Sequence, residues 1–577
     1  MGCLWDGVVK LMRRENLVLL LLFIGAWAIR SVGVDYGYFH GDERMNDAAK
    51  AMTGQLIPGQ HFYPPLLNYI NAVGFAGLFA VGKGLSWWQS AGDFRAQYFD
   101  DPTIFYITAR FLTGAMGALI APLAFVIARG LKQSVARAAI VGVMVGITPL
   151  GVYFSFIAKG DVPLATATIL IVLVFLQRMR VPASMRLDVM LGLVVVIGLS
   201  FKHSLVFFLV PLLIAHGALL LPQTGGRGYL RALGTSLLTI LVAWPVLNIG
   251  IVLDFENFIT FQKIQAVMSV QEDASLWQAM GLWLDRATHL QWGINGVMVI
   301  AFLLLPVLLM SGASRLPQRR ALMALWLVTG VGILLLAAVV RLRQPEHLWI
   351  SFFMVMQLLA ALALVDLAGH ARRAVSGIAW GALGISAALS IYALVLLWGQ
   401  TLAAPVTQDI SRIISQEYAD RKVLTGVVLD IPKTMAAQAF EFARLDGLAA
   451  KYDVQMPERA PERTIQTDVT GSVFHIPMPG VMFGLEDATD EELKGKVKPY
   501  AWPLQKQEWQ VKHWVAQGFD VIVVSHLEYL INETPSATFR KFYASLAQTC
   551  TAAHVIAPRK PLFLEREVII FDCANVN

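Results

Sequence analysis

The stretch that decides the fold is NLVLLLLFIGAWAIRSVGV, residues 16–34, which the acidic segment YFHGDERMND, residues 38–47, follows. An apolar run of this length is close to the ~20 residues that a helix needs to cross a bilayer. Similar runs recur along the chain and predict about eleven spans, at residues 16–34, 103–129, 138–158, 162–177, 187–202, 204–222, 233–253, 293–311, 322–340, 347–368 and 377–400. We therefore expect an all-α polytopic membrane domain.

The composition agrees with this prediction. Of 577 residues, 56% are hydrophobic and 15% are charged, whereas a soluble chain carries about 25% charged residues. The net charge of +6 comes from short basic clusters between apolar runs. Such clusters report membrane orientation, so we expect membrane lipids and no nucleic acid as partners.

The basic clusters occupy every second connection between the predicted spans. They comprise Lys10, Arg13 and Arg14; Arg129, Lys132 and Arg137; Arg178, Arg180 and Arg186; Arg227 and Arg231; Arg315, Arg319 and Arg320; and Arg372 and Arg373. Cytoplasmic loops carry such an excess of Lys and Arg. The pattern predicts a bacterial inner-membrane protein with a cytoplasmic N-terminus and a periplasmic C-terminal region.

Residues 64–82 are almost long enough to span, but a span here would reverse every later assignment. We therefore expect an interfacial helix in the first outer loop, held at the interface by Trp87 and Trp88.

Residues 401–577 have an ordinary globular composition, which predicts a soluble α/β domain after the membrane domain of residues 1–400. Residues 423–429 and 520–524 are typical of buried strands, and 433–451 of a helix. Cys550 and Cys573 lie in this region. The sequence leaves two alternatives open for them, a disulfide in an oxidising compartment or two unpaired buried cysteines.

The acidic pair Asp42 and Glu43 begins the first outer loop, and apolar residues at helical spacing follow it. One interpretation is structural: Asp42 caps a helix and Glu43 lies in its first turn. The other is a catalytic carboxylate at the membrane surface.

Other charged residues lie close to apolar runs on the same side. Asp161 has only Lys159 and Gly160 as polar neighbours, and a carboxylate so near the hydrocarbon usually has a partner or a function. The simpler alternative is a Lys159–Asp161 ion pair. Arg341 and Arg343 lie in a short outer turn, where they would bind an anion such as phosphate or extend to lipid headgroups.

Several short motifs occur in order along residues 1–400. They are the Asp42-Glu43 pair, GQHFYPPLL at residues 59–67, the lone Asp161 after a turn containing Ser155, GLSFKH at residues 198–203, and the arginine-rich turn before a late apolar helix. In this order the membrane part resembles the GT-C superfamily of lipid-linked-sugar transferases, in particular its protein O-mannosyltransferase and aminoarabinose-transferase branch.

This resemblance implies a glycosyltransferase with a polyprenyl-phosphate sugar as donor and a glycan, lipid or protein as acceptor, usually with inversion. By this resemblance, Asp42 would act on the acceptor hydroxyl, and its neighbour Glu43 would orient groups or accept hydrogen bonds. Asp161 would help to hold the acceptor or the helix that bears the base. The donor phosphate needs cations, and those available are Arg341, Arg343, Lys202 and Lys159. The donor groove would include His61, Tyr63, Pro64 and Pro65.

The chain departs from the aminoarabinose branch at Tyr63, where those enzymes carry a lysine, and this makes an aminoarabinose donor doubtful. No cofactor is expected to be required. Asp42, Asp161 and a third ligand could hold Mg²⁺ or Mn²⁺, but no Asp-x-Asp cluster supports this, so we favour metal independence. The loop at 254–292, with Trp277, Trp283 and Trp292, would either cover the site or form an interfacial aromatic belt.

Two other classes compete with the transferase. A transporter or flippase of lipid-linked or anionic substrates would carry its polar groups at mid-membrane, often in inverted repeats, whereas here the acids gather at one face and no repeat is visible. A lipid-carrier polymerase or ligase would rely on a large late outer loop rather than on an acidic first loop.

Overall fold

The computed structural model describes residues 2–40, 42–59, 61–269, 275–425, 452, 464–467, 470–475, 509–532, 537–563 and 565–576. The chain divides into two compact units. The first comprises Met1–Val34, His40–Phe94 and Ile104–Trp398. The second comprises Gly399–Asn577 together with Asp35–Phe39 and Arg95–Thr103, two segments that the prediction had placed in the membrane domain.

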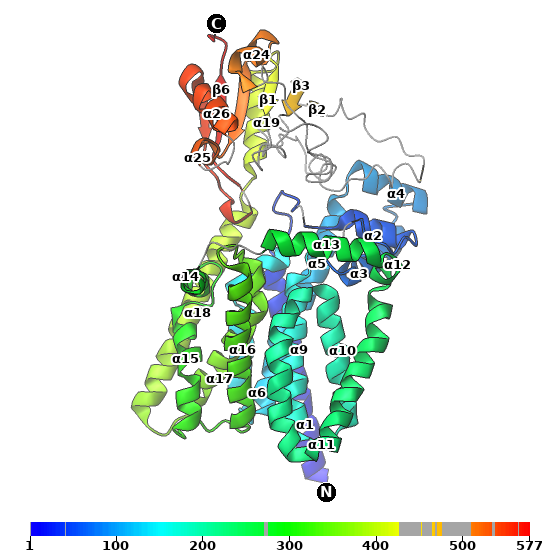
Figure 1. Ribbon diagram of the computed structural model, residues 1–577, viewed down its shortest axis with the longest axis vertical. Helices are drawn as coiled ribbons and strands as arrows, with labels where there is room; N and C mark the ends of the chain where they lie inside the picture. Colours follow the sequence, from blue (N-terminus) through cyan, green and yellow to red (C-terminus); the bar gives the residue numbers. More distant parts are fainter. Residues whose placement is uncertain are drawn as a thin grey trace. The chain divides into compact units, whose positions relative to one another are not determined.

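The first unit is a bundle of helices (Figure 1). Its elements, with the three helices α4, α5 and α18 that cross the unit boundaries, are α1 (Gly2–Ser31), α2 (Met45–Met52), α3 (Leu66–Gly84), α4 (Ala91–Asp100), α5 (Thr103–Ala118), α6 (Ile120–Gly130), α7 (Val135–Gly146), α8 (Pro149–Tyr153), η1 (Phe154–Phe156), α9 (Asp161–Arg180), α10 (Met185–Phe201), η2 (His203–Leu205), α11 (Val206–Leu247), α12 (Ile249–Leu253), α13 (Phe255–Ser269), α14 (Leu276–Thr288), α15 (Gly296–Met310), α16 (Arg319–Val340), η3 (Glu346–Trp349), α17 (Ile350–Ala368) and α18 (Arg373–Leu402).

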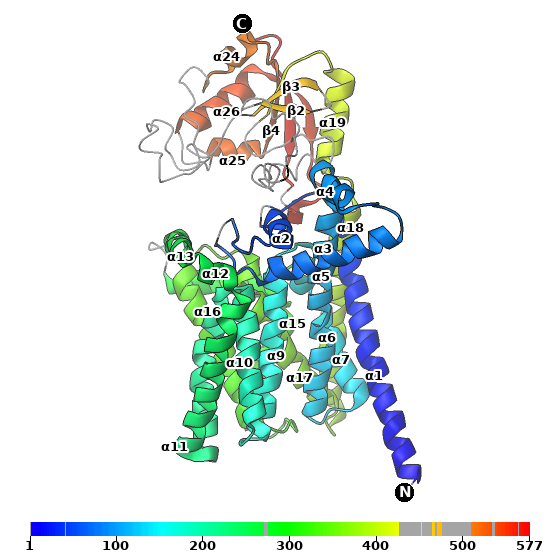
Figure 2. The same cartoon turned by 90° about the vertical axis from the view of Figure 1, so that its right-hand side faces the viewer.

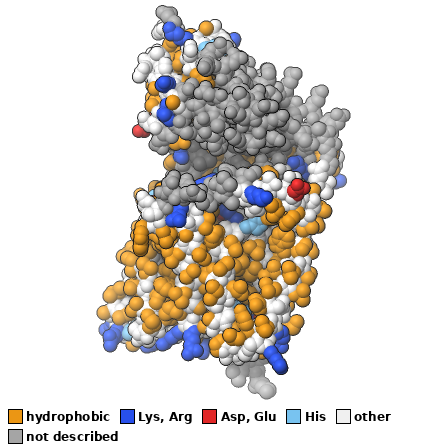
Figure 3. All heavy atoms as spheres, viewed as in Figure 1, with side chains coloured by type: hydrophobic (Ala, Val, Ile, Leu, Met, Phe, Trp, Pro, Cys, Tyr) orange, Lys and Arg blue, Asp and Glu red, His pale blue; other side chains and the backbone are white. Residues whose placement is uncertain are grey.

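The centre of the bundle is formed by α9 and α17, which pack against each other. Almost every side chain of α17 is buried, as expected of a helix that is apolar on all sides. Peripheral helices such as α11 and α18 instead expose large apolar side chains. Figure 3 shows this apolar surface along the bundle, with Lys and Arg side chains gathered at one end.

Helix α11 contains two of the predicted spans. Its backbone is non-helical at Gly225, where φ is +68°, a conformation that glycine adopts without strain. The Tyr229 hydroxyl lies 2.9 Å from where a β-carbon on Gly217 would be, and residues twelve positions apart in one straight helix would be separated by about 18 Å. The two arms of α11 therefore fold back on each other, as the separate spans 204–222 and 233–253 predict.

Among the described residues, seven helices are long and apolar enough to cross a membrane, or eight if the bent pair α7 and α8–η1 counts as one span. The predicted number was larger for physical reasons. The two arms of α11 are one continuous element in this count, and α10 and α15 have only 17 and 15 residues. The chain is a multi-pass membrane protein with several apolar spanning helices.

Helix α3 lies across the bundle rather than along it (Figure 2), as predicted for an interfacial helix, although its length and composition alone would also suit a span. The expected role of Trp88 is wrong. Its indole is buried against Gly82 of α3 and against Phe94, so of the two tryptophans only Trp87 is exposed.

In the described part of the second unit, six strands form a sheet in the order β2-β3-β1-β4-β6-β5. Its elements are α19 (Val406–Glu417), β1 (Val423–Thr425), β2 (Thr464–Thr467), β3 (Thr470–His475), α24 (Val511–Ala516), β4 (Val521–Ser525), α25 (Leu527–Asn532), α26 (Ala537–Thr549), β5 (Thr551–Ile556), η5 (Pro561–Phe563) and β6 (Val568–Asp572). Strand β1 is parallel to both β3 and β4, and the remaining pairs are antiparallel.

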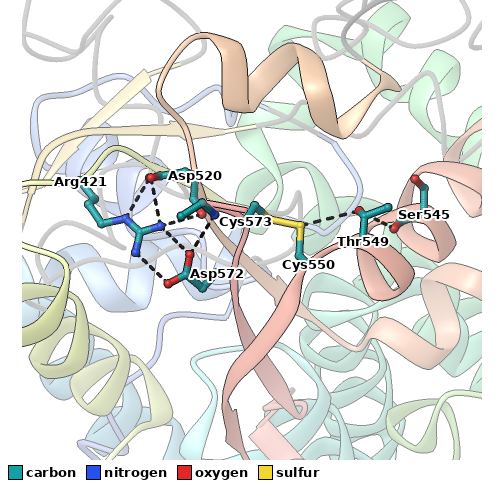
Figure 4. The surroundings of a disulfide bond; sticks show 8 residues. Arg421, Asp520, Ser545, Thr549, Cys550, Asp572 and Cys573 are labelled. Atoms are coloured by element: carbon teal, nitrogen blue, oxygen red, sulfur yellow. Dashed lines mark hydrogen bonds and ion pairs between the residues drawn. A yellow bond between two sulfur atoms is a disulfide. The ribbon is translucent and has the colours of Figure 1, made fainter. Parts of the chain in front are cut away.

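The two predicted strands correspond to β1 and β4, and the predicted helix at 433–451 lies outside the described residues. A disulfide joins Cys550, after α26, to Cys573, after β6, with Cα atoms 4.6 Å apart. Beside it, Arg421 forms ion pairs with Asp520 and Asp572 (Figure 4). The disulfide and these ion pairs fix the ends of β4 and β6.

Candidate active site

Glu43 fixes the acidic loop to the bundle. Its carboxylate accepts two hydrogen bonds from the Arg110 guanidinium of α5, at 2.8 and 2.7 Å, and both side chains are fully buried. The same carboxylate accepts the backbone N–H of His40 at 3.0 Å and of Ala158 at 2.9 Å. Glu43 therefore ties the first outer loop to the segment that precedes Lys159. This geometry suits orientation rather than chemistry.

Asp42 does not cap a helix. Arg44 occupies the N-cap position of α2, and no side chain caps that helix. Instead, the Asp42 carboxylate lies 2.7 Å from the Lys159 ammonium. The structural interpretation of Asp42 from the sequence is therefore wrong, because a basic residue distant in sequence competes successfully for this carboxylate.

Two lysines and two carboxylates form a continuous network. Lys159 Nζ lies 3.6 Å from Asp161 Oδ2, and Lys202 Nζ lies 2.5 Å from Asp161 Oδ1. Asp161 is the first residue of α9, and Lys202 has extended backbone at the break between α10 and η2. Because burying a charge is favourable only when it is paired, the network explains how these charges are accommodated beside apolar helices.

Gly160 makes this arrangement possible. A β-carbon at Gly160 would lie 2.6 Å from the carbonyl oxygen of Phe201, well inside van der Waals contact. The turn at residues 159–161 can therefore approach the backbone before Lys202 this closely only with glycine at position 160. The closeness of Asp161 and Lys202 depends on this glycine.

The Tyr63 ring lies beneath both ammonium groups. Lys159 Nζ is 5.5 Å and Lys202 Nζ 5.8 Å from the ring centroid, within the range of cation–π attraction. Burial raises the pKa of the Tyr63 hydroxyl well above its ordinary value, and nearby Lys159 only partly opposes this. Tyr63 is therefore a neutral surface on which two cations converge.

The charges of the network also determine its protonation. Burial alone would raise the pKa of Asp42, but Lys159 and His40 outweigh burial and lower the pKa to about 2. Burial alone would lower the pKa of Lys159, but the carboxylates of Asp161 and Asp42 outweigh it and raise the pKa above its ordinary value. At neutral pH both members of the Asp42–Lys159 pair are charged.

Two histidines near the network were not identified from the sequence. The His40 ring accepts the N–H of Asp42 through Nδ1 at 3.1 Å, and burial lowers the pKa of His40. His347 interacts electrostatically with Asp161 and Lys202. It was discoverable, because it lies in the same short turn as Arg341 and Arg343.

That turn therefore reaches the site through His347. Arg341 follows the last residue of α16 with φ +49°, and Arg343 is exposed. Contact of Arg341 and Arg343 with a donor phosphate stays a prediction.

The proline pair and His61 shape the neighbouring loop. Pro64 and Pro65 are buried, and Pro65 is the N-cap residue of α3. His61 Nε2 lies 2.7 Å from Asp254 Oδ2, and its ring contacts Phe258 and Phe261 of α13. The loop at 254–292 thus begins beside the predicted groove, whose role in binding the donor stays a prediction.

A metal ion at Asp42 and Asp161 would have to displace Lys159, which pairs with both carboxylates. Within the described ranges, no group of three His, Cys, Asp or Glu side chains is placed to hold a metal ion. The dependence on a metal stays a prediction.

Residues 60–256, which include Tyr63, Lys159, Asp161 and Lys202, match the family model of dolichyl-phosphate-mannose-protein mannosyltransferase. The structure resembles the crystal structure of ArnT from Cupriavidus metallidurans bound to undecaprenyl phosphate, with a TM-score of 0.50 and 13% identity over 96% of this chain and 97% of that one. The fold is that of the GT-C superfamily.

Other GT-C structures are similar at lower scores. The apo state of the same ArnT gives a TM-score of 0.45 at 14% identity over 96% of this chain and 98% of that one. The oligosaccharyltransferase of Archaeoglobus fulgidus gives 0.40 at 11% identity over 94% of this chain and 72% of that one. No curated protein matches the sequence. The predicted resemblance to the GT-C superfamily is confirmed.

Proposed function

We propose that this protein is a glycosyltransferase that moves a sugar from a polyprenyl-phosphate donor to a hydroxyl group of a glycan, lipid or protein acceptor on the periplasmic face of the inner membrane. The observation that carries the proposal is the junction of Asp42 with Lys159 and Lys202 over Tyr63. The family match of residues 60–256 and the GT-C fold support a transferase that uses a polyprenyl-phosphate sugar.

The two lysines suit the leaving group. When the bond to the sugar breaks, negative charge grows on the lipid phosphate, and preorganised cations stabilise it. Lys159 and Lys202 are already held close to each other by their shared partner Asp161. Both ammonium groups lie near the Tyr63 ring, and they would supply the positive charge that the resemblance assigns to a lysine at this position in the aminoarabinose branch.

Asp42 can act as the general base if Lys159 leaves Asp42 and pairs with the donor phosphate instead. While paired with Lys159, Asp42 has a pKa of about 2 and is a weak base. A donor phosphate beside Lys159 would compete with Asp42 for the ammonium group. Without this attraction, the effect of burial would raise the pKa of Asp42. Arrival of the donor would thus strengthen the base that deprotonates the acceptor hydroxyl.

A single displacement by that hydroxyl inverts the anomeric carbon, because the hydroxyl attacks from the face opposite the leaving phosphate. The new bond forms between the acceptor oxygen and the anomeric carbon, and the bond to the phosphate oxygen breaks. The proton passes to Asp42 and the electron pair to the phosphate. Asp161 holds Lys202 and Lys159 throughout.

The proposal is tested with purified protein and a panel of radiolabelled polyprenyl-phosphate sugars and acceptors. We expect transfer from at least one donor, a product of inverted configuration, no inhibition by EDTA, and loss of transfer in Asp42→Asn. Asp100→Asn removes an exposed carboxylate of the same outer loop and is the matched control. Wild-type transfer by Asp42→Asn would contradict the catalytic assignment. A retained configuration would exclude the single displacement, and absence of transfer from every donor would favour a transporter.

A further inference from the structure

A groove opens on the side of the first unit, away from the candidate site, between α11, α15 and α16. It encloses about 710 Å³, a volume within the ~300–1,000 Å³ that is typical of ligand pockets. Every lining side chain except those of Arg319 and Arg320 is apolar. Because α16 ends beside the turn that carries His347 to the site, its first residues, and the two arginines with them, lie at the opposite end of the bundle.

Helices α11 and α16 pack closely on the site side of the groove and leave space beyond that contact. A β-carbon at Gly332 of α16 would lie 2.8 Å from the carbonyl oxygen of Phe207 in α11, so the two backbones are in close contact there. Nearer the start of α16, the lining residues include Ala215, Ala218 and Ala324. Their short side chains do not fill the space between the helices, and the groove results.

The length of the groove matches one leaflet of a bilayer. Its lining residues on α16 run from Arg319 to Val331, a separation of twelve positions, which is about 18 Å along a helix. Half of a hydrocarbon core of ~30 Å is about 15 Å. Ile214 and Leu327, which also line the groove, are 70% and 50% exposed, so the groove is open to the surrounding hydrocarbon. It therefore suits an acyl chain of a lipid in the leaflet nearest the arginines.

The start of α16 supplies positive charge at the mouth of the groove. Arg319 and Arg320 are exposed residues of its first turn, and the side chain of the N-cap residue Gln318 makes no capping hydrogen bond. Cations are unfavourable at this positive end of a helix dipole, whereas an anion is stabilised there. Arg319 donates a hydrogen bond to the Ser314 carbonyl at 2.7 Å, and within the described part of the chain neither arginine forms an ion pair. A bound anion would compensate both arginines and the helix end.

We propose that this groove is a binding site for one anionic phospholipid, whose acyl chain lies between α11 and α16 and whose phosphate is bound by Arg319 and Arg320. Basic pockets between spanning helices on the cytoplasmic side of a membrane bind such head groups, and this end of the bundle is the one predicted to be cytoplasmic. The lipid is distinct from the proposed sugar donor, because the donor phosphate is assigned to Lys159 and Lys202 at the other end. The inference does not depend on the proposed glycosyl transfer.

The test is native mass spectrometry of the purified full-length protein, titrated in detergent with phosphatidylglycerol or with phosphatidylcholine of the same acyl chains. We expect wild type to retain one phosphatidylglycerol about 10-fold more tightly than phosphatidylcholine, which carries no net charge. Arg319→Gln with Arg320→Gln should weaken retention of phosphatidylglycerol about 10- to 30-fold, because each arginine near an anionic head group contributes a factor of about five. Retention of phosphatidylcholine should stay nearly unchanged.

Matched controls separate this groove from the rest of the basic, apolar surface. Arg372→Gln with Arg373→Gln removes two exposed arginines from another connection at the same end of the bundle and should retain phosphatidylglycerol as wild type does. Ala218→Phe places a large side chain in the groove and should weaken retention of both lipids. Ala388→Phe changes an exposed position of α18 outside the groove and should leave retention unchanged. The melting temperature of each variant in lipid-free detergent is the control for folding.

Three results would overturn the inference. The first is equal retention of the two lipids by wild type, or the same loss in both double-arginine variants. The second is wild-type retention of phosphatidylglycerol by Ala218→Phe, because the acyl chain would then lie elsewhere. The third is displacement of phosphatidylglycerol by an equimolar amount of undecaprenyl phosphate, which would identify the occupant as a carrier lipid rather than a phospholipid.

Discussion

Replacement of Glu43 by glutamine should destabilise the first unit and abolish ordered placement of Asp42. The carboxylate is fully buried and makes four hydrogen bonds, two with Arg110 and two with backbone N–H groups. Glutamine keeps the shape but removes the charge, and it offers one acceptor oxygen in place of two. The Arg110 guanidinium then remains buried without a counter-ion.

The magnitude follows from this geometry. Removing one partner of a buried ion pair costs about 3–5 kcal/mol, because the other charge is left uncompensated. The double variant Glu43→Leu with Arg110→Met removes both charges and should recover much of this loss. It should not recover all of it, because the N–H groups of His40 and Ala158 still lack an acceptor, at about 1–3 kcal/mol each.

The assay is denaturant unfolding of the purified protein in detergent, with transfer activity measured on the same samples. Glu256→Gln, which changes an exposed carboxylate of α13, is the control and should match wild type. We expect Glu43→Gln to lose both stability and activity, and the double variant to regain stability without activity. Full stability in Glu43→Gln with activity lost would refute the anchoring role and assign Glu43 to the chemistry itself.

Three further predictions follow from the site and the second unit. Gly160→Ala should lower kcat/KM for the donor about 10-fold or more, because the added β-carbon meets the Phe201 carbonyl and separates Asp161 from Lys202; steady-state kinetics check this, and wild-type kinetics would contradict it. In the folded protein the pKa of Asp42 is about 2, against an ordinary value of 3.8. The ionised carboxylate therefore stabilises the folded state by at most about 2 kcal/mol, fully above pH 4 and progressively less as the pH falls through 2. The free energies of unfolding of wild type and Asp42→Asn should differ at pH 7 and converge in acid. Cys550→Ser should lower the stability of the second unit by about 3 kcal/mol, given the 23-residue separation from Cys573, and limited proteolysis should show faster cleavage there.

Much of the fold could be predicted because apolar run length and the alternation of basic clusters are local signals. These signals predicted both arms of α11 and set α3 apart from the spans, and α3 does lie across the bundle. The inclusion of Asp35–Phe39 in the second unit could not be predicted, since Tyr38 and Glu565 are 527 positions apart and neither has a local pattern that indicates the other.

The candidate site was predictable in its residues but not in its pairing. Asp42, Lys159, Asp161 and Lys202 each stood out as charges beside apolar runs. The sequence suggested a local Lys159–Asp161 pair, whereas Lys159 lies closer to Asp42. Arg110, the partner of Glu43, was missed, although an arginine inside the apolar run at 103–129, far from its basic end at Arg129, indicates a buried partner.

The central claim is that Asp42 removes the acceptor proton while Lys159 and Lys202 hold the donor phosphate. The most direct test is single-turnover transfer from donor already bound to the protein, compared between wild type and Asp42→Asn, with donor affinity measured on the same samples. We predict that Asp42→Asn binds the donor at least as tightly as wild type, because Asp42 no longer competes for Lys159, and that transfer is slower by about 100-fold or more. Transfer at the wild-type rate from bound donor would contradict the account.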